Sequence, residues 1–268
     1  MRPTARHTAR LALIAGTALA LVALAGCGGG DDNDSATGTT TTSVAARPLR
    51  IMVTNDDGVG AAGIDTLVEA LRKEPNVEVV VVAPAENKSG TGGSTTEGAL
   101  TVTDAQTASG YPAKSVAGFP ADTVVWAIDG SNVARPDLVM SGINQGQNLG
   151  PVINASGTVG AARAAAARGI PAVALSQGLA DSPDYPTGAE IAVQWLRENR
   201  DRLEGVVVNI NIPSCPTGSV RGVIAVPAAT AGDTFGTPDC TSGITGPSDD
   251  IQAFVNGYVP LSVIPTAA

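Results

Sequence analysis

Two adjacent aspartates, Asp56 and Asp57, are the residues whose type and position best suit chemistry in this chain. They follow a short apolar run, residues 49–53, and precede Gly58 and a segment with helical spacing. Paired carboxylates at the end of a strand suit a hard cation that faces an open cleft. Asn, Asp and Gly are also common turn residues, and for residues 55–58 alone a turn is the better explanation. The rest of the chain reverses that preference.

The N-terminus has the pattern of a bacterial export signal. Three arginines lie within residues 2–10, and an apolar run of 15 residues follows at 11–25. This run is shorter than the ~20 residues that span a bilayer, so a signal is favoured over a transmembrane anchor. It ends in the sequence LAGC at residues 24–27, which resembles a lipobox. We therefore expect residues 1–26 to be removed and Cys27 to carry lipid, which anchors an exported protein to the outer face of the bacterial cell membrane.

The composition changes sharply after the signal. Residues 27–46 are mostly Gly, Asp, Ser and Thr, which predicts a flexible tether, and residues 47–268 are long enough for one α/β domain. The signal holds three of the 16 Lys and Arg residues and none of the 25 acidic residues, which leaves 13 basic against 25 acidic residues and a formal net charge of −12. An acidic chain without a basic cluster argues against duplex nucleic acid as a partner, but not against small phosphorylated substrates.

The domain contains no histidine, because His7 in the signal is the only one in the chain. Ser-His-Asp and Cys-His catalysis are therefore excluded, as are zinc sites built on imidazole. Besides Cys27 the chain has two cysteines, Cys215 and Cys240, and a disulfide can persist in an exported protein. We expect these two to be bonded, with two unpaired thiols as the alternative.

Strand and helix patterns alternate along the domain. The predicted strands are 49–53, 77–82, 137–140, 172–175 and 206–212, and the predicted helices are 64–73, 120–128, 156–168 and one that a capping box opens at 187–190. Short strands are predicted at 100–102 and 113–116, and at 223–226 and 258–264 in a β-rich C-terminal extension. This alternation predicts a doubly wound α/β fold with a mostly parallel sheet.

Three polar segments, 55–58, 86–93 and 141–158, follow predicted strands and are expected to converge where ligands bind in such folds. Asp56 and Asp57 offer carboxylates there, Ser89 a hydroxyl and Asn144 an amide oxygen. All-oxygen ligation with two carboxylates suits Mg²⁺, Mn²⁺ or Ca²⁺. Taken alone, Ser89 is better explained as a loop residue that caps its own backbone.

Ser156, Gly157 and Thr158 open a predicted helix, whose free N–H groups and dipole favour an anion. A plain N-cap is the alternative. A hard cation beside an anion-binding helix start predicts hydrolysis of phosphate esters. The base is then Asp56, Asp57 or a water held by the metal, and the residues do not decide among these.

Seven groups of residues resemble motifs of the SurE family of metal-dependent 5′/3′-nucleotidases. They are TNDDG at 54–58, GI at 63–64, VAP at 82–84 with NKSG at 87–90, GFPAD at 118–122, PDLV at 136–139 with SGIN at 141–144, NLG at 148–150, and SGTVGAA at 156–162. They occur in family-like order and spacing between residues 49 and 176. The whole set is specific, whereas no single motif is.

The resemblance implies a Rossmann-like three-layer α/β/α core with a swapped C-terminal extension, assembled as a homodimer or homotetramer. It implies one divalent metal per subunit and release of phosphate from nucleoside monophosphates, with some breadth toward other phosphate monoesters. The implied metal ligands are Asp56, Asp57, Ser89 and Asn144, and the implied phosphate-binding residues are Asn144, Ser156, Gly157 and Thr158. A binding lipoprotein that captures a nucleotide or phosphate without turnover is the alternative from another class.

Two stretches depart from the family pattern. The family usually has Ala-Pro-Gly where this chain has Ala-Ala-Gly at residues 61–63. Between Gly150 and Ser156 the family usually has an acidic pair and an aromatic residue, whereas this chain has Pro151, Val152 and Ala155 there. Such groups near a phosphate site can contact the base or the sugar, so the nucleoside preference is left open.

Overall fold

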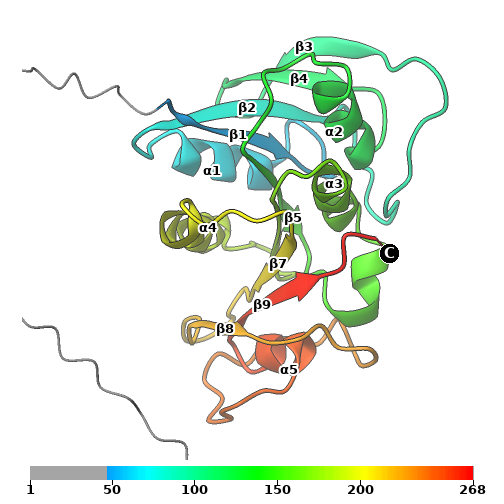
Figure 1. The fold of residues 1–268 in the computed structure, drawn as a ribbon. Helices are drawn as coiled ribbons and strands as arrows, with labels where there is room; N and C mark the ends of the chain where they lie inside the picture. Colours follow the sequence, from blue (N-terminus) through cyan, green and yellow to red (C-terminus); the bar gives the residue numbers. More distant parts are fainter. Residues whose placement is uncertain (1–46, 268) are drawn as a thin grey trace, which may run out of the picture. The chain divides into compact units, whose positions relative to one another are not determined.

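A mixed nine-stranded β-sheet organises the residues that the computed structural model describes, 47–267 (Figure 1). The strands are β1 (Leu49–Thr54), β2 (Val77–Pro84), β3 (Val102–Gln106), β4 (Pro112–Val116), β5 (Leu138–Gln145), β6 (Ala172–Gln177), β7 (Val207–Ile212), β8 (Val223–Ala225) and β9 (Val259–Ile264). Their order across the sheet is β3-β4-β2-β1-β5-β6-β7-β9-β8. The run from β4 to β7 is parallel, as is the β8–β9 pair, whereas β3 and β9 run antiparallel to β4 and β7. The predicted mostly parallel α/β fold is confirmed.

The predicted signal, the tether and Cys27 lie outside the described residues. Within residues 47–267, none of the helices has the length and apolar character needed to cross a membrane.

Helices cover both faces of the sheet (Figure 1). On one face, α1 (Ala62–Leu71) contacts α4 (Tyr185–Asn199), and on the other α2 (Pro120–Ile128) contacts α3 (Gly157–Ala166). Ile64, Leu67 and Leu71 of α1 are fully buried, because their helical spacing places them on the side that faces the sheet. The alanines of α3 pack against the opposite face, where small side chains let this helix lie close to the strands. The sheet thus has an apolar layer on each side, as expected for parallel strands.

Most element boundaries differ from the sequence prediction by one or two residues, and three differences change how a segment is described. β5 continues to Gln145 rather than ending at Met140, because its last residues still pair with β6 after an irregularity in register. β3 begins only at Val102. The predicted capping box at 187–190 is wrong, since α4 already begins at Tyr185 and the N–H of Thr187 donates to the side chain of its cap, Asp184, at 3.3 Å.

The C-terminal extension contains a helix, α5 (Asp250–Val255), that the sequence pattern did not predict. Asp249 caps it, because its side chain accepts from the N–H of Gln252 at 2.9 Å. Ile251 and Phe254 lie three residues apart on its buried side and pack with Leu149. A single pair at this spacing, in a short segment rich in Gly and Pro, is too weak a periodic signal to indicate a helix.

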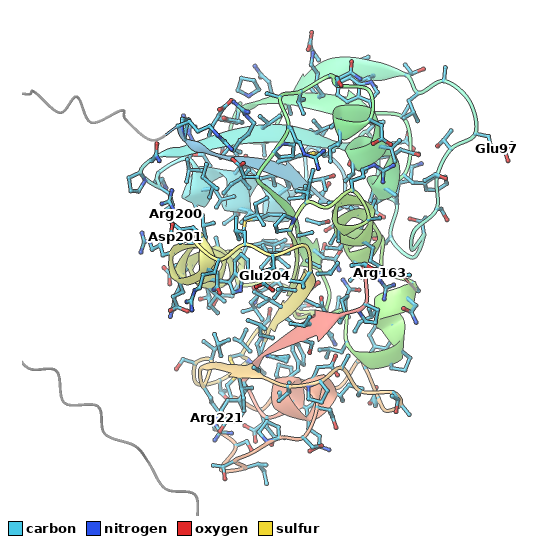
Figure 2. All side chains as sticks on the ribbon, in the orientation of Figure 1. Glu97, Arg163, Arg200, Asp201, Glu204 and Arg221 are labelled. Atoms are coloured by element: carbon cyan, nitrogen blue, oxygen red, sulfur yellow. A yellow bond between two sulfur atoms is a disulfide. The ribbon has the colours of Figure 1, made fainter. Side chains whose placement is uncertain are left out.

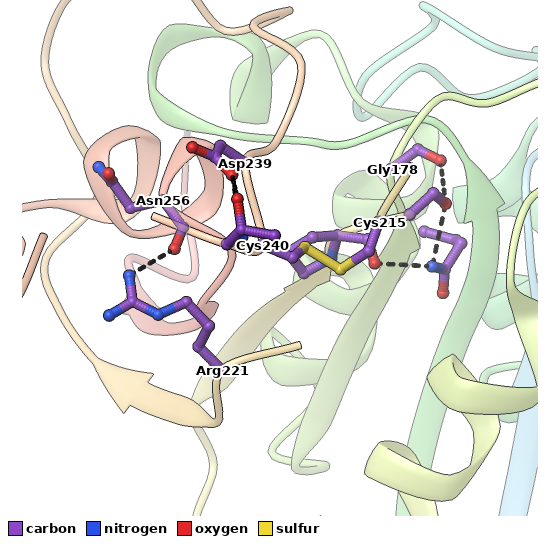
Figure 3. The surroundings of a disulfide bond; sticks show 10 residues. Gly178, Cys215, Arg221, Asp239, Cys240 and Asn256 are labelled. Atoms are coloured by element: carbon purple, nitrogen blue, oxygen red, sulfur yellow. Dashed lines mark hydrogen bonds between the residues drawn. A yellow bond between two sulfur atoms is a disulfide. The ribbon is translucent and has the colours of Figure 1, made fainter. Parts of the chain in front are cut away.

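The structure contains a disulfide between Cys215 and Cys240, the pair expected from the sequence (Figure 3). It joins the segment after β7 to the segment before α5. Next to it, Nη1 of Arg221 donates to the carbonyl oxygen of Asn256 at 3.0 Å, and the guanidinium lies over the ring of Tyr258. The extension is thus held to the sheet by a covalent bond as well as by β8 and β9.

Replacing both cysteines by serine, Cys215→Ser with Cys240→Ser, is expected to lower the free energy of unfolding by about 3 kcal/mol, because an unfolded loop of about 25 residues is no longer closed. Urea denaturation of the full chain measures this change. Reducing agent should destabilise the wild type by a similar amount and leave the double variant unchanged. Equal denaturation midpoints for oxidised wild type and the double variant would contradict the prediction.

Candidate functional site

The three polar segments predicted to converge do meet at one edge of the sheet. β1 pairs in parallel with both β2 and β5, so the carboxyl ends of these strands lie side by side. After β2, the N–H of Lys88 donates to the carbonyl oxygen of Asp56 at 2.7 Å. At the end of β5, the N–H of Gln145 donates to Oδ2 of Asp57 at 2.9 Å. The third segment arrives through Thr158, at the start of α3, which contacts Asp56.

Asp57 is half-buried, and both of its carboxylate oxygens accept hydrogen bonds. Oδ1 accepts from Nδ2 of Asn87 at 3.2 Å, and Oδ2 accepts from the N–H of Gln145. Burial raises the pKa of the Asp57 carboxyl above its usual value, while these two hydrogen bonds lower it. The carboxylate is therefore fixed in orientation, and its negative charge is only partly compensated by the protein.

Asp56 is only 2% exposed and faces the start of α3. Its Oδ1 accepts from the hydroxyl of Thr158 at 2.7 Å, and its Oδ2 accepts from the N–H of the same residue at 3.1 Å. Burial raises the pKa of Asp56 to about 6, and the charge of Asp57 raises it as well, although the Thr158 hydrogen bonds oppose this. Gly157 permits the close approach, since a Cβ there would lie 2.8 Å from Cβ of Asp56.

At the start of α3, the predicted phosphate site, some of the hydrogen-bond donors are already used by other groups of the protein. Ser156 is the N-cap, as predicted, and its Oγ accepts from the N–H of Val159 at 3.2 Å. Thr158 gives both of its donors to Asp56. A carboxylate is the kind of anion that a helix start favours, so the observed contact agrees with the expected electrostatics. Phosphate binding by Ser156, Gly157 and Thr158 stays a prediction, and a phosphate there would share this helix end with Asp56.

Ser89 and Asn144, the two predicted neutral ligands, belong to segments that hold Asp57: Ser89 to the loop after β2 and Asn144 to the end of β5. The N–H of Ser89 donates to Oδ1 of Asn87 at 2.9 Å, and the residue is exposed. Asn144 is buried, and its Nδ2 donates to the carbonyl oxygen of Gly146 at 2.7 Å. No residue in the 47–267 range donates to the Asn144 amide oxygen, which is therefore available to a ligand. Their roles as metal ligands stay predictions.

The sequence prediction did not include Asn55, and the structure gives it a distinctive environment. Its Nδ2 donates to the carbonyl oxygen of Gly58 at 2.8 Å, which closes the turn around the two aspartates. Its Oδ1 is buried and has no hydrogen-bond partner among the described residues. A buried oxygen without a donor is costly unless something else, such as a cation, compensates it. The only earlier signal was its place next to Asp56.

The oxygens at this site fit a hard divalent cation. They comprise two adjacent carboxylates whose ionisation is disfavoured by burial. The neutral oxygens come from Asn55 beside Asp56, from Ser89 in the loop after β2, and from Asn144 at the end of β5. Within residues 47–267 there is no group of three or more His, Cys, Asp or Glu side chains that could hold a metal. A cation here would therefore depend on neutral oxygens as well as on Asp56 and Asp57.

Buried amides hold the loop that follows β5, a feature missed by the sequence prediction. The N–H of Asn148 donates to Oδ1 of Asn211 at 2.7 Å, and its Nδ2 donates to Oγ of Ser176 at 2.9 Å. Its carbonyl oxygen accepts from Nδ2 of Asn209 at 2.8 Å. The signal was present in β7, whose sequence VVNINI places two asparagines at buried strand positions. These contacts position the segment between β5 and α3.

Two basic side chains belong to segments that contribute to the site, Arg163 to α3 and Lys88 to the loop after β2. Arg163 of α3 donates to Oδ1 of Asn154 at 3.0 Å and to the carbonyl oxygen of Pro265 at 3.1 Å, and is thus committed to the C-terminal segment (Figure 2). Lys88 lies 3.6 Å from the carboxylate of Glu86 in the loop after β2. Because the loop after β2 contacts both aspartates, Lys88 is the one of these two basic residues that this loop brings to the site.

A cavity of about 350 Å³ opens beside the aspartates, and Asp57, Ala62, Asn87, Gln145 and Tyr185 line it. Burial raises the pKa of Tyr185 to about 12, and the negative charge of Asp57 adds to the shift. The cavity gives a small molecule access to Asp57.

Comparison with known proteins identifies the family. Residues 51–232 match the family model described as survival protein SurE. The 5′-nucleotidase SurE of Symbiobacterium thermophilum is 40% identical over 177 residues, which cover 65% of this chain and 69% of the relative. The 5′/3′-nucleotidase SurE of Yersinia enterocolitica is 39% identical over 178 residues, covering 65% and 68%. The crystal structure of SurE from Aquifex aeolicus matches with a TM-score of 0.66 at 28% identity, covering 81% of this chain and 93% of that one. Because the match runs from β1 to β8 and includes both aspartates and the start of α3, this chain belongs to the SurE family.

Proposed function

We propose that this protein is a divalent-metal-dependent nucleotidase that hydrolyses nucleoside 5′- and 3′-monophosphates to nucleoside and phosphate. The observation that carries the proposal is the pair Asp56 and Asp57, which hydrogen bonds link to the loop after β2, the end of β5 and the start of α3. Relatives that are 39 to 40% identical are named for this activity. Breadth toward other phosphate monoesters is part of the proposal.

The site residues divide into those that hold the cation and those that face the substrate. Asp56, Asp57, Ser89 and Asn144 would hold one Mg²⁺, Mn²⁺ or Ca²⁺ per subunit, and the unpartnered Oδ1 of Asn55 supports the fit of a cation. When bound, such a cation supplies positive charge that stabilises the negative charge developing on the phosphoryl oxygens.

The chain itself then supplies orientation and proton transfer. The N–H of Gly157, the first residue of α3, is a donor for a phosphate oxygen, since the N–H groups of Thr158 and Val159 already donate to Asp56 and Ser156. Thr158 holds both oxygens of Asp56, whereas Asp57 lines the open cavity. This difference supports Asp57, rather than Asp56, as the carboxylate that accepts a proton from an attacking water.

Phosphate release from several nucleoside monophosphates tests the proposal. With Mn²⁺ or Mg²⁺ we expect hydrolysis by the full chain, loss of hydrolysis in excess chelator, and recovery when the metal is restored. Release that persists in chelator would contradict the metal requirement. Tight nucleotide binding without phosphate release, metal present, would instead identify a binding lipoprotein.

We further propose that the protein is exported and anchored by lipid at Cys27. The signal-like composition of residues 1–26 supports this, as does the Cys215–Cys240 disulfide, a bond typical of oxidising compartments. Cys27→Ser is expected to move the protein from the membrane fraction to the soluble fraction of cells, and a variant that stays with the membrane would contradict the anchor. A homodimer or homotetramer is the proposed assembly, which light scattering tests.

A further inference from the structure

Tyr185 presents an aromatic ring to the cavity beside Asp57 and is held firmly in place. It is the first residue of α4 and follows the cap Asp184. The ring is partly buried against the core, and its Cε1 lies close enough to α1 that a Cβ on Gly63 would be 3.0 Å from it. A ring fixed in this way loses little conformational freedom when a ligand packs on it. It is therefore a preorganised surface.

The described residues include three tyrosines, and their hydroxyl groups are used differently. The hydroxyl of Tyr111 donates to the carbonyl oxygen of Val79 at 2.8 Å, and that of Tyr258 donates to Ile244 at 3.4 Å. Among the described residues, the hydroxyl of Tyr185 has no such acceptor. Only 3% of the chain is aromatic, so a tyrosine whose hydroxyl is free and whose ring lines the cavity beside Asp57 is distinctive.

The same cavity offers one uncommitted side-chain amide. The amide of Asn87 is used on both sides, since Nδ2 donates to Asp57 and Oδ1 accepts from the N–H of Ser89. Gln145 uses its backbone N–H to hold Asp57, and its exposed side chain forms no hydrogen bond with the described residues. An amide that can both donate and accept suits the polar edge of a heterocyclic base or a ribose hydroxyl.

We propose that Tyr185 is the platform on which the base of a nucleoside monophosphate stacks, with the Gln145 amide as its polar partner. The inference rests on the proposed nucleotidase function. It follows from position, because the cavity shares Asp57 with the reacting centre and the nucleoside must lie next to the phosphate that it leaves. Stacking on a ring tolerates any base, since every base has an aromatic face. The protein is therefore expected to accept purine and pyrimidine nucleotides alike.

Kinetics with AMP and with ribose 5-phosphate, which lacks the base, test the platform in the full chain. Tyr185→Ala is expected to lower the ratio of KM for ribose 5-phosphate to KM for AMP by about tenfold, equivalent to about 1.4 kcal/mol of stacking. Tyr185→Phe keeps the ring and should hold this ratio within about twofold of wild type. The change should appear in KM rather than in kcat. Tyr258→Ala, which removes a tyrosine near α5, is the control and should keep the wild-type ratio.

Calorimetric titration with adenosine separates this inference from the proposed function, because it requires no turnover. Adenosine should bind the wild type and Tyr185→Phe alike and bind Tyr185→Ala about tenfold more weakly, whether or not phosphate is released. Equal adenosine affinity in wild type and Tyr185→Ala would overturn the platform. Phe119 lines a separate cavity of about 240 Å³ with Lys88, so loss of adenosine binding in Phe119→Ala alone would also overturn it. Absence of phosphate release from either substrate would count against the nucleotidase function instead.

Discussion

Asp57→Asn is expected to lower kcat for nucleoside monophosphates at least about a thousandfold, on the order of 4 kcal/mol of transition-state stabilisation. The substitution preserves size and shape, and its amide oxygen can still accept from the N–H of Gln145. It removes one of the two negative charges available to a cation and the proposed proton acceptor. Phosphate release at saturating substrate measures the loss, and calorimetric titration with Mn²⁺ should show weaker metal binding.

A matched control makes this result specific. Asp181 is an exposed aspartate shortly before α4, and Asp181→Asn removes the same charge from the chain. This control is expected to keep wild-type kinetics and Mn²⁺ affinity. Because Asp57 is only half-buried, the Asp57→Asn variant should unfold within about 1 kcal/mol of wild type. A folded Asp57→Asn variant that hydrolyses nucleotides at close to the wild-type rate would show that the mechanism does not need this carboxylate.

The sheet was predictable because its signals are local. The near-continuous valines of β2 and the apolar spacing of α1 each require only a short window of sequence. The end of β5 was not predictable in this way, because four of the residues 141–145 are Ser, Gly, Asn and Gln, and their strand conformation depends on pairing with β6. The capping of α4 was missed for a related reason, since Thr187 and Asp184 are both good caps and only the fold selects Asp184.

The position of the site was predictable, whereas its internal contacts were not. Parallel strands end at a common edge, so polar segments that follow neighbouring strands must meet there. The hydrogen bonds from Thr158 to Asp56 join residues 102 positions apart, and no local pattern specifies such a pairing. The unpartnered oxygen of Asn55 is likewise a property of three-dimensional packing. Tyr185 precedes the predicted helix start at 187 and has no local signal, and only the fold brings it to the cavity beside Asp57.

Gly63→Ala is expected to lower the free energy of unfolding by about 3 kcal/mol and kcat/KM by about a hundredfold, although glycine is the poorer helix former. Gly63 lies in the first turn of α1, where a Cβ would overlap the carbonyl oxygen of Ile143 in β5 and crowd the ring of Tyr185. That carbonyl is backbone and directly precedes Asn144. Relieving the overlap must therefore move α1 or β5, and either movement displaces oxygens at the site.

Gly60→Ala is the matched control for this prediction, because a Cβ at Gly60 meets no atom within 4 Å. The same added methyl group, three residues earlier, should change stability by less than about 0.5 kcal/mol and leave the kinetics as in wild type. Thermal unfolding and phosphate release measured on both variants separate the steric effect from a general effect of glycine removal. If Gly63→Ala were as stable and as active as Gly60→Ala, the close packing of α1 on β5 would not be what positions Asn144.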